Sequence, residues 1–581
     1  MGVRVSLSRS YSRRRGWYSA VALGAAVLVV AACSSSGTGS TSTNSSSPAK
    51  ASTVKTGGQA VFALDEDIAG FNPLQYADNE YVLAEIQNQT LPSVYIIQPN
   101  FTLKLDTDIV TSATVTNTSP QTIVYQINPK AVWSDGVPVS AADFIYNWQA
   151  QSADAKYKDV GNAAYLPVTT AGYNQISSVT GSNNGKTVTI VFSKPFSDWQ
   201  SLFDPFIPAH IAEKVGFNNG FQNFGPQDQV SAGPYMIQSY NKNVSLVEVR
   251  NPKWWGTPGN LTKEIYDFIL DDSQAPPAMA NGEVDLINPA LGSTTLLESL
   301  KAIPNTTVSV SPGLEFQHMD FNESNPYLAL ASVRHALAYG TNRQQMLQRL
   351  VDPLTTKIGL IGNHIFMAPQ PQYQDESAGY GAFNPTQAES LLKSAGMTMG
   401  SDGYFHPNFG PEKGQDFTLS ISTTSGVEER LELEELFQAD MKSIGVKINI
   451  QNYAANTLFG TIGPKSEFQI IEFAWVLSPF ASANQTIYCS YTDTAVCAEN
   501  WDHYSDPKVD TLFDQALSTI NPTQDAALYN QIDGLLWKDM ATLPLFEEPT
   551  MFAWTSTYGN IVPNASSQGF SWNANLWGEK V

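Results

Sequence analysis

Cysteine, basic residues and long apolar runs are scarce in this chain, and each scarcity excludes a class of protein. Three cysteines among 581 residues are too few for a scaffold built on disulfides. The six histidines are scattered and no CxxC occurs, so we expect neither a metal centre nor a cofactor. The chain holds 32 Lys and Arg against 54 Asp and Glu, a net charge of −22, which argues against nucleic acid as a partner. No apolar run reaches the ~18 residues of a spanning helix.

The motifs of common enzyme classes are absent as well. The chain contains no nucleophile elbow (GxSxG), no Walker loop and no GxGxxG fingerprint. The acidic runs 65–67 and 271–272 are typical of solvated loops rather than of cation sites. We therefore expect a protein that is not an enzyme. A hydrolase that uses two carboxylates distant in sequence stays open as a third hypothesis, because spacing alone does not reveal such a pair.

The first sixty residues indicate export and anchoring. Five arginines precede an apolar run from Trp17 to Ala32. The run is too short for a spanning helix, and a basic start followed by a short apolar run is typical of an export signal. The run ends in Val30-Ala31-Ala32-Cys33, which resembles the lipobox of bacterial lipoproteins, whose cysteine receives a lipid. A plain secretory signal with a chance cysteine is the alternative, and the export route, general or twin-arginine, stays open. We predict a signal peptide over 1–32, lipidation of Cys33, and a Ser/Thr/Gly tether over 33–58 that holds the protein at the outer face of the cytoplasmic membrane.

Strand and helix patterns alternate from Gln59 onward. The clearest unit is 417–450, in which a period-two stretch, a stretch of helical spacing and a second period-two stretch follow one another. Strand, helix and strand of this length predict a parallel pair with a crossover. Asn or Asp before Pro predicts helices that begin after 384, 506 and 521, and Thr341 with Gln344 predicts a capping box.

Cys489 and Cys497 are separated by seven residues in a loop rich in Tyr, Thr and Ala. In an oxidising compartment a disulfide is the expected state of such a pair. Two free thiols are the alternative.

Ten short motifs follow one another between about residues 60 and 550. They are Val132–Phe144, Trp148, Ala232–Tyr235, Arg250–Gly256, Gly282–Asp285, Ser332–Leu337, Asn342-Arg343, Asn384–Gly396, Ser443–Val446 and Leu543–Leu545. In this order they resemble the extracytoplasmic solute-binding proteins of family 5, which include oligopeptide- and dipeptide-binding lipoproteins of ABC importers. The stretch 116–143 is most similar to a branch that includes LpqW, which is associated with control of cell-wall glycolipid synthesis rather than with uptake.

The resemblance implies an α/β fold of the type II periplasmic-binding-protein kind. Two lobes with mixed sheets are joined by a hinge and close on a ligand in the cleft, and a third domain is inserted in the first lobe. The implied division is lobe I over 59–90, 205–315 and 550–581, the inserted domain over 91–204, and lobe II over 316–549.

The resemblance also implies which residues contact the ligand. Peptide binders of the family have a cleft strand that ends in Trp, and an Asp three residues later binds the ammonium group of the ligand. Here Trp475 matches the tryptophan, but Ser478 stands in place of the aspartate. Glu472 takes a place where some members have a basic residue, and Trp475 in the core or Glu472 facing solvent are the alternatives. The further candidates for ligand contact are Ala474, Val476, Tyr165, Asn79 and Glu548.

Two hypotheses of different class follow. The first is a monomeric, membrane-anchored binding protein that delivers a small peptide or another polar solute to an ABC permease. The loss of the aspartate and the presence of acids at Glu472, Glu547 and Glu548 favour a neutral or cationic solute over an ordinary free peptide. The second is an LpqW-like regulatory lipoprotein of the cell envelope that imports nothing.

Overall fold

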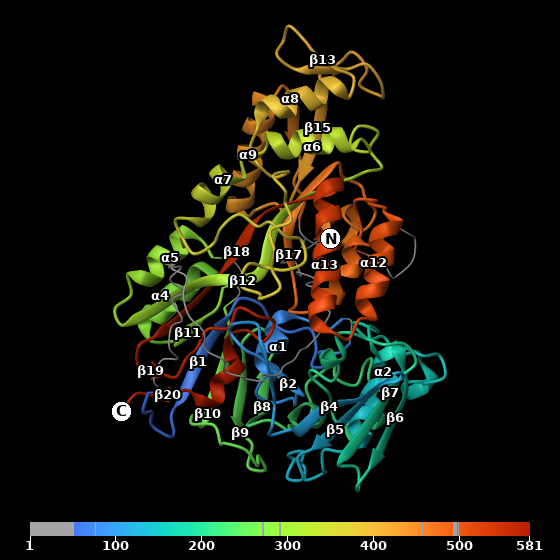
Figure 1. The fold of residues 1–581 in the computed structure, drawn as a ribbon. Coiled ribbons are helices and arrows are strands. Elements are labelled where there is room, and N and C mark those ends of the chain that lie inside the picture. The colour runs from blue at the N-terminus through green and yellow to red at the C-terminus, as the bar shows by residue number, and fades with distance from the viewer. Residues whose placement is uncertain are drawn as a thin grey trace, which may run out of the picture.

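Two long antiparallel strands, β12 (Thr306–Phe321) and β18 (Thr542–Thr555), run through the middle of the molecule and connect its two ends (Figure 1). The structure is a computed structural model that describes residues 52–581 except 76, 270–271, 290–291, 455–456, 492–496 and 498. The predicted signal peptide and the predicted lipidation site at Cys33 lie outside the described residues.

A ten-stranded sheet is built around these two strands, in the order β16-β15-β17-β12-β18-β11-β1-β10-β9-β8. The ladder between β12 and β18 is interrupted between Pro312 and Phe316, and Pro312 lies opposite Pro549. Proline has no N–H to donate, so the hydrogen-bond ladder is weakened at this point. The interruption coincides with the borders predicted between lobes I and II, where the chain needs a hinge.

Lobe I carries one end of the sheet. Its strands are mixed, because β1 is parallel to β10 and β11 whereas β8, β9 and β10 are joined as antiparallel neighbours. Its elements are β1 (Gln59–Leu64), α1 (Tyr81–Gln87), α3 (Ala209–Val215), β8 (Tyr235–Asn241), β9 (Ser245–Arg250), β10 (Lys263–Phe268), α4 (Ala275–Asn281), β11 (Leu286–Ile287), α5 (Thr294–Lys301), β19 (Tyr558–Gly559) and β20 (Gly578–Glu579).

The segment predicted as an inserted domain forms its own antiparallel sheet, in the order β4-β5-β7-β6. The chain turns between β6 and β7 at Asn183, Asn184 and Gly185, which all adopt positive φ, and Asn-Gly is a residue pair that favours such a turn. Its elements are β2 (Tyr95–Ile97), β3 (Leu103–Leu105), β4 (Val110–Thr118), β5 (Gln121–Ile127), α2 (Ala141–Gln151), β6 (Ile176–Ser182) and β7 (Thr187–Phe192).

Lobe II carries the other end of the sheet and most of the helices. The parallel pair predicted over 417–450 is confirmed, since β15 and β16 are parallel and α9 connects them. Its elements are α6 (Ala331–Gly340), α7 (Arg343–Met346), α8 (Pro385–Ser394), β13 (Met397–Met399), β14 (Phe405–Pro407), β15 (Thr418–Ser422), α9 (Glu428–Ser443), β16 (Lys447–Ile450), β17 (Ile470–Val476), α11 (Gln485–Tyr488), α12 (Pro507–Leu517) and α13 (Pro522–Asp539).

Three of the four predicted helix starts are confirmed, and the fourth is wrong by one residue. The side chains of Asn384, Asp506 and Asn521 accept hydrogen bonds from the first backbone N–H groups of α8, α12 and α13. At α7 the cap is Asn342, not Thr341. The Thr341 hydroxyl instead donates to the Leu337 carbonyl at 2.8 Å, because α6 extends to Gly340 and leaves carbonyls to satisfy at its end.

The first described residues differ from the expectation of a free tether up to residue 58. Val54 forms a β-bridge with Lys580, and the Lys55 N–H donates to the Glu579 carbonyl at 2.7 Å. The Gly57 N–H donates to the Asn260 carbonyl at 2.8 Å. Residues 52–58 therefore belong to the folded body, because backbone pairing with the C-terminal residues outweighs their low apolar content.

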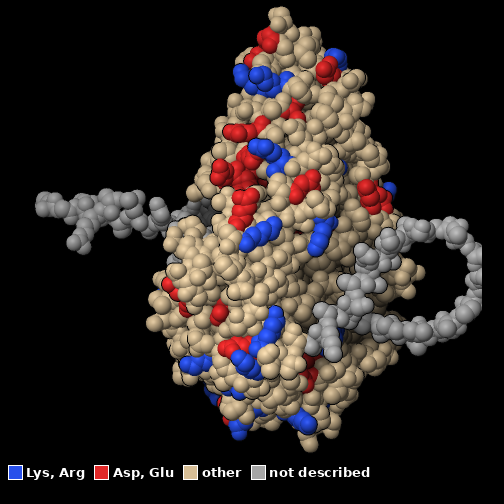
Figure 2. Space-filling view, turned by 90° about the vertical axis from the view of Figure 1, so that its left-hand side faces the viewer, with Lys and Arg blue, Asp and Glu red and all other residues tan. Residues whose placement is uncertain are grey.

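The three largest clusters of buried apolar residues are centred on lobe II, on the inserted domain and on lobe I, and the lobe I cluster also includes Tyr146, Ala150 and Tyr165 of the inserted domain. This favours the predicted division of the chain. On the face shown in Figure 2, charged side chains of both signs are interspersed and no continuous basic patch forms. None of the described helices combines the length and the apolar character that a membrane crossing requires.

Candidate functional site

Strand β17 has one edge that is only half covered. It pairs with β12 along its whole length, from Ile470 to Val476. On its other side β15 pairs only with Ile470 and Ile471. In the described part of the chain, the stretch from Phe473 to Val476 therefore has no strand beside it on that edge. An unpaired strand edge can bind an extended ligand through its backbone N–H and C=O groups.

Successive side chains of β17 point to opposite faces of the sheet. Trp475 and Phe473 share one face, where their rings meet at 4.8 Å between centroids. Trp475 also stacks on His318 at 5.7 Å and lies 6.1 Å from Trp501, and its side chain is partly buried. No described residue accepts a hydrogen bond from its indole N–H. Trp475 is thus part of an aromatic cluster and still has a polar group to offer.

Glu472 lies on the opposite face of β17 from Trp475, together with Ala474 and Val476. Its side chain is fully buried, so the alternative that it faces solvent is wrong. Burial raises the pKa of the Glu472 carboxyl, and the Arg430 guanidinium, the Thr423 hydroxyl and His318 act in the opposite direction. Neither of its oxygens has a hydrogen bond of normal length from a described residue.

Helix α9 brings two further charged residues to Glu472. Arg430 is almost fully buried, and one of its guanidinium nitrogens donates to the Thr424 hydroxyl at 3.3 Å. Glu434 accepts from the Asn452 amide at 2.6 Å. Burial raises the pKa of Glu434 to about 8, the Glu472 charge adds to that rise, and Asn452 and Arg430 oppose it. One arginine therefore lies among several carboxylates.

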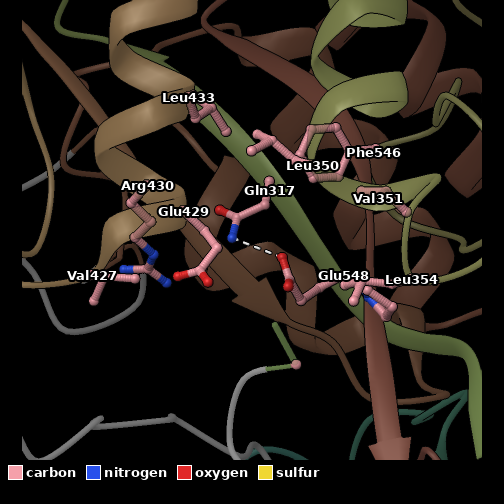
Figure 3. A pocket seen from close by; sticks show the side chains of 12 residues that line it. Gln317, Leu350, Val351, Leu354, Val427, Glu429, Arg430, Leu433, Phe546 and Glu548 are labelled. Carbon is pink, nitrogen blue, oxygen red and sulfur yellow. Dashed lines mark hydrogen bonds between the residues drawn. The ribbon is translucent and has the colours of Figure 1, made fainter. Parts of the chain in front are cut away.

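A pocket opens beside this charged group, at the predicted junction of the lobes (Figure 3). It encloses about 440 Å³ of unfilled space, which includes solvent at its mouth. The Gln317 amide donates to the Glu548 carboxylate at 2.8 Å across it. Gly292 comes from lobe I and the other lining residues from lobe II: Gln317, Leu350, Val351, Leu354, Val427, Glu429, Arg430, Leu433, Phe546, Glu548 and Pro549.

The structure brings only some of the candidate residues together. Glu548 lines the pocket, and Ala474 is paired with Gln317, which also lines it. Val476 is paired with Glu315 at the end of β17. Ser478 follows that strand in a turn, where its hydroxyl and the Phe480 backbone are 3.3 Å apart.

The remaining candidates do not line the pocket. Tyr165 is buried in the lobe I core, with its ring edge-on to Tyr146 and Phe217. Asn79 is partly buried in the loop before α1. Glu547 points away from Glu548 along β18, and its carboxylate accepts from the Ala368 N–H at 2.7 Å. Burial raises the pKa of Glu547 to about 7.

Cys489 and Cys497 form the predicted disulfide in the structure, with Cα atoms 5.7 Å apart. Both cysteines are buried. The bond joins Cys489, which follows α11 directly, to Cys497, which lies four residues before Trp501 of the aromatic cluster.

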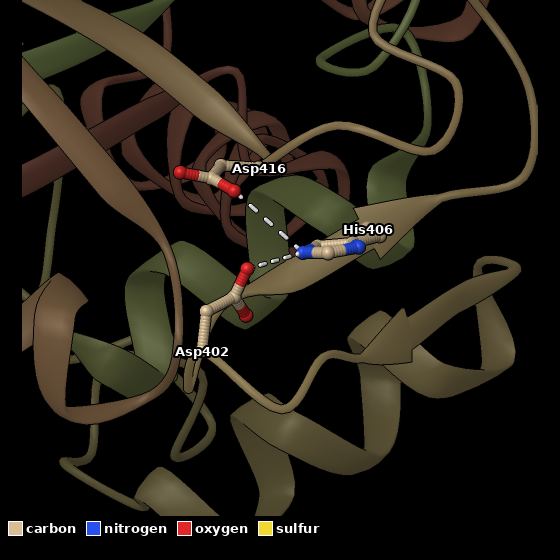
Figure 4. Close-up of side chains that lie close together, drawn as sticks. All are labelled: Asp402, His406 and Asp416. Atoms are coloured by element: carbon tan, nitrogen blue, oxygen red, sulfur yellow. Dashed lines mark hydrogen bonds and ion pairs between the residues drawn. The ribbon is translucent and has the colours of Figure 1, made fainter.

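One His/Asp group among the described residues has the spacing of a metal site (Figure 4). His406 Nε2 lies 2.9 Å from Asp402 and 3.6 Å from Asp416, and Lys447 pairs with Asp416 at 3.2 Å. These ion pairs account for the arrangement without a metal. Asp402 precedes β14, His406 lies on β14 and Asp416 precedes β15. None of the three residues lines the pocket of Figure 3.

Arg430, Glu429, Gln317 and Glu434 were not among the predicted site residues. A usable signal was present for two of them. Ligands in α/β proteins bind at the carboxyl ends of parallel strands, and α9 follows β15, so Glu429 and Arg430 in its first turn were candidates. Gln317 and Glu434 carry no such signal, because only the three-dimensional fold places them beside β17.

Residues 104–495 match the model of the bacterial extracellular solute-binding proteins, family 5 (middle part). OppA of Mycobacterium tuberculosis, named an oligopeptide-binding protein, is 30% identical over 520 residues, which cover 88% of this chain and 83% of OppA. The chain belongs to this family. The predicted family, its mixed α/β binding-protein fold and its class as a binding protein rather than an enzyme are thereby confirmed.

Two other similarities bear on the role within the family. LpqW of M. tuberculosis, named a probable monoacyl phosphatidylinositol tetramannoside-binding protein, is 27% identical over 380 residues, which cover 63% of this chain and 56% of LpqW. The OppA match is therefore longer and more identical than the LpqW match. The solved structure of EppA, a periplasmic EDTA-binding protein, superposes with a TM-score of 0.83 at 27% identity and covers 92% of this chain and 98% of EppA.

Proposed function

We propose that this protein is the lipid-anchored binding protein of an ABC importer, and that it holds a small peptide or another polar solute between its lobes for delivery to the permease. The observation that carries the proposal is the uncovered edge of β17 from Phe473 to Val476. The neighbouring strand β12 contributes Gln317 to a pocket at the predicted lobe junction. A mycobacterial relative named for oligopeptide binding and a structural neighbour named for EDTA binding both support a polar solute.

The ligand is recognised by its backbone and by the groups around β17. An extended solute pairs with the free edge of Ala474 to Val476. Trp475 offers an aromatic face and an indole N–H, and Glu548 offers a carboxylate. Ser478 lacks the charge that would bind a free ammonium group, which favours solutes other than ordinary free peptides.

Native mass spectrometry of the gently purified full chain tests the binding function. We expect a bound solute of a few hundred daltons that is released on denaturation. The proposal fails if the protein is empty and no member of a library of peptides and small polar solutes binds in calorimetry. The mass of the intact complex also reports whether the chain is a monomer.

The proposed lipid anchor is inferred from the short apolar run and from Cys33, and a separate experiment tests it. Cys33→Ala should release the protein from membranes, whereas Ser34→Ala should leave it bound. If the Cys33→Ala protein stays in the membrane fraction after a salt wash, the lipid anchor is wrong, although the solute-binding role is untouched.

A second function is favoured by one observation, the similarity to LpqW. In that case the protein binds a glycolipid of the cell envelope and regulates its synthesis instead of importing a solute. The same mass spectrum decides between the two, because a glycolipid would add more than a thousand daltons and would contain hexose.

A further inference from the structure

Lobe II touches the domain that is predicted to be inserted in lobe I, in addition to the strands that join the two lobes. The Ser197 N–H of the inserted domain donates to the carbonyl of Leu517, the last residue of α12, at 2.9 Å. The Ser482 N–H of lobe II donates to the Asp198 carboxylate at 3.1 Å. In Figure 1, α12 and α13 end beside the inserted domain. Two hydrogen bonds therefore connect residues 197–198 with two separate places in lobe II.

An apolar side chain crosses the same boundary. Phe480 of lobe II follows the end of β17 by four residues and is only 3% exposed. It belongs to the buried apolar cluster of the inserted domain, together with Phe196 and Trp199. A side chain of one unit is thus buried in the core of the other, so it stays buried only while the two units are in contact.

A second phenylalanine crosses in the opposite direction. Phe101 lies at the tip of the β2–β3 hairpin of the inserted domain and is also buried. Its φ of 59° is uncommon for an aromatic residue, and such a conformation persists where the surrounding packing fixes it. The other buried members of its apolar cluster come from β12 and lobe II: Leu314, Phe316, Ile361, Met367 and Leu477.

The short stretch 477–480 takes part in both contacts. Leu477 belongs to the cluster that holds Phe101, and Phe480 belongs to the cluster of the inserted domain. The Leu477 N–H donates to the Leu314 carbonyl at 2.7 Å, in the stretch where the ladder between β12 and β18 is interrupted. Trp475, at the uncovered edge of β17, packs against the cluster of Phe101. The stretch therefore adjoins the proposed ligand strand and the proposed hinge.

We propose that Phe480, Phe101 and the hydrogen bonds of Ser197 and Ser482 form a latch that holds the lobes closed over a solute at the edge of β17. The inference rests on the proposed function and concerns its regulation. Because the two long strands that join the lobes have an interrupted ladder, the other contacts between the lobes decide how easily they separate. Burial of both phenylalanine rings favours the closed state. A solute paired with β17 fixes the start of the stretch 477–480 and so favours the latched arrangement.

A permanent interface has the same contacts as a latch but behaves differently. If Phe480 were only a core residue of the inserted domain, its contacts would break only when that domain unfolds. A latch opens while both units stay folded, because the lobes move about β12 and β18. Amide hydrogen exchange distinguishes the two, since it reports the free energy at which each hydrogen bond opens.

Hydrogen–deuterium exchange mass spectrometry of the gently purified full chain tests the latch. We expect the Ser197 and Ser482 amides to exchange at one common rate, at least tenfold faster than the amides of β5 and β15 in the two cores. A rate equal to that of β5 would indicate a permanent interface and overturn the latch. Two clearly different rates would indicate separate local openings and would overturn it as well.

Variants at the two phenylalanines test whether the contacts act together. Phe480→Ala and Phe101→Ala should each raise the exchange of both latch amides at least tenfold and leave β5 and β15 within twofold. Phe101 makes neither hydrogen bond, so its effect on them would show the coupling. Phe383→Ala removes an exposed phenylalanine of lobe II and is the matched control, which should change nothing.

A variant may instead act on folding. If Phe480→Ala raises the exchange of β5 as much as that of Ser197, Phe480 supports only the core of the inserted domain and the latch is overturned. Asp198→Ala is the second variant if neither phenylalanine variant folds, because it removes only the acceptor of the Ser482 N–H. It should raise the exchange of Ser197 at least fivefold, and no change at Ser197 would overturn the latch.

The capped peptide acetyl-Ala-Ala-Ala-amide tests the link to the solute, because its backbone can pair with the edge of β17. At saturation it should slow the exchange of Ser197 and Ser482 at least fivefold. It should also dissociate at least fivefold faster from Phe480→Ala than from the wild-type protein. If this peptide does not bind, the library member that binds most tightly in calorimetry takes its place.

The outcomes separate this inference from the function on which it rests. A solute that binds in calorimetry but leaves the exchange of both latch amides unchanged overturns the latch, and solute binding stands. A protein that is empty in native mass spectrometry and binds no library member overturns the proposed function, and the latch falls with it.

Discussion

Lobes I and II each bury a pair of glutamates, but the two pairs have different surroundings. In lobe I, Glu248 of β9 and Glu264 of β10 are directly opposite each other in the antiparallel ladder, and both are fully buried. None of their four carboxylate oxygens has a hydrogen bond of normal length from a described residue. In lobe II, Glu472 and Glu434 share the charge of Arg430 and lie behind a pocket.

The difference separates a stability feature from a binding feature. Burial raises the pKa of Glu264 to about 8 and raises that of Glu248 well above its ordinary value, and the charge of Glu264 contributes to the rise at Glu248. Among the residues that shift these two pKa values there is no arginine or lysine, so the folded lobe I keeps protons on the pair. The lobe II pair has the Arg430 guanidinium close to it and lies next to the residues that line a pocket.

The largest expected effect is an alkaline loss of stability in lobe I. The pKa of Glu264 rises from 4.5 to about 8, so the folded state holds more protons than the unfolded state between these values. Stability then falls as the pH rises through this range. A rise of this size corresponds to on the order of 5 kcal/mol. Urea unfolding of the wild-type protein from pH 5 to pH 9 should show the decline, and Glu248→Gln/Glu264→Gln should flatten it. A double variant with the same pH slope as the wild type would contradict the assignment.

The second prediction removes the cation that distinguishes lobe II. Arg430→Met should destabilise the protein by on the order of 3 kcal/mol at pH 8, because Glu472 and Glu434 would then be buried without a cation. The loss should shrink at pH 5, where Glu434, whose pKa is raised to about 8, holds a proton and needs no cation. Arg349→Met is the control, since Arg349 forms an exposed ion pair with Glu432 and should matter little. Urea midpoints at the two pH values measure both effects. An equal loss at both would show that Arg430 acts only through packing.

The surroundings of the lobe II pair include features that the sequence predicts and features that only the fold reveals. The parallel unit around α9 and three helix caps were predictable, because each rests on local periodicity or on one capping side chain. The strand that holds Glu472 and Trp475 was expected from the resemblance to the family and not from its own pattern. The opposite orientation of Glu472 and Trp475 was predictable as well, since a spacing of three residues in a strand always separates the faces. Residues 52–58 were not, because their partners are the last residues of the chain.

The lobe I pair marks the other limit of sequence reasoning. In Ser245–Arg250 the alternation offers Val247 and Val249 as the natural core face, yet Leu246 and Glu248 are the buried residues. Neighbouring strands decide the orientation, because Glu264, Tyr266 and Phe268 of β10 are buried on the same face. A strand with apolar residues on one side and mixed residues on the other does not reveal its core face by itself.

The third prediction tests whether the two lobes lose stability independently. Cys489→Ser/Cys497→Ser removes a cross-link that lies entirely in lobe II, and the closure of so short a loop contributes ~2–3 kcal/mol in the chain-entropy model. We expect the unfolding of lobe II to shift to lower urea, whereas the alkaline decline attributed to Glu264 keeps its slope. Reduction of the wild-type protein should reproduce the shift. If the alkaline slope changes together with the disulfide, the two lobes unfold as one unit.

The smallest expected effect concerns the end of β17, where lobe II lacks a charge that the family's peptide binders carry. Ser478 is three residues after Trp475 and its hydroxyl closes a turn with Phe480, which an aspartate carboxylate can also do by accepting from the Phe480 N–H. Ser478→Asp should therefore fold normally and gain a partner for a ligand ammonium group. Peptides with a free N-terminus should then bind about tenfold more tightly, equivalent to ~1.4 kcal/mol, while the affinity of their acetylated forms stays unchanged.

Ser478→Asn is the control, because asparagine has nearly the same shape as aspartate without the charge, and it should show no gain in affinity. Tight binding of free peptides by the wild-type protein, unaffected by Ser478→Asp, would mean that their ammonium group is held elsewhere, and the carboxylates of the lobe II pocket would be the next place to test.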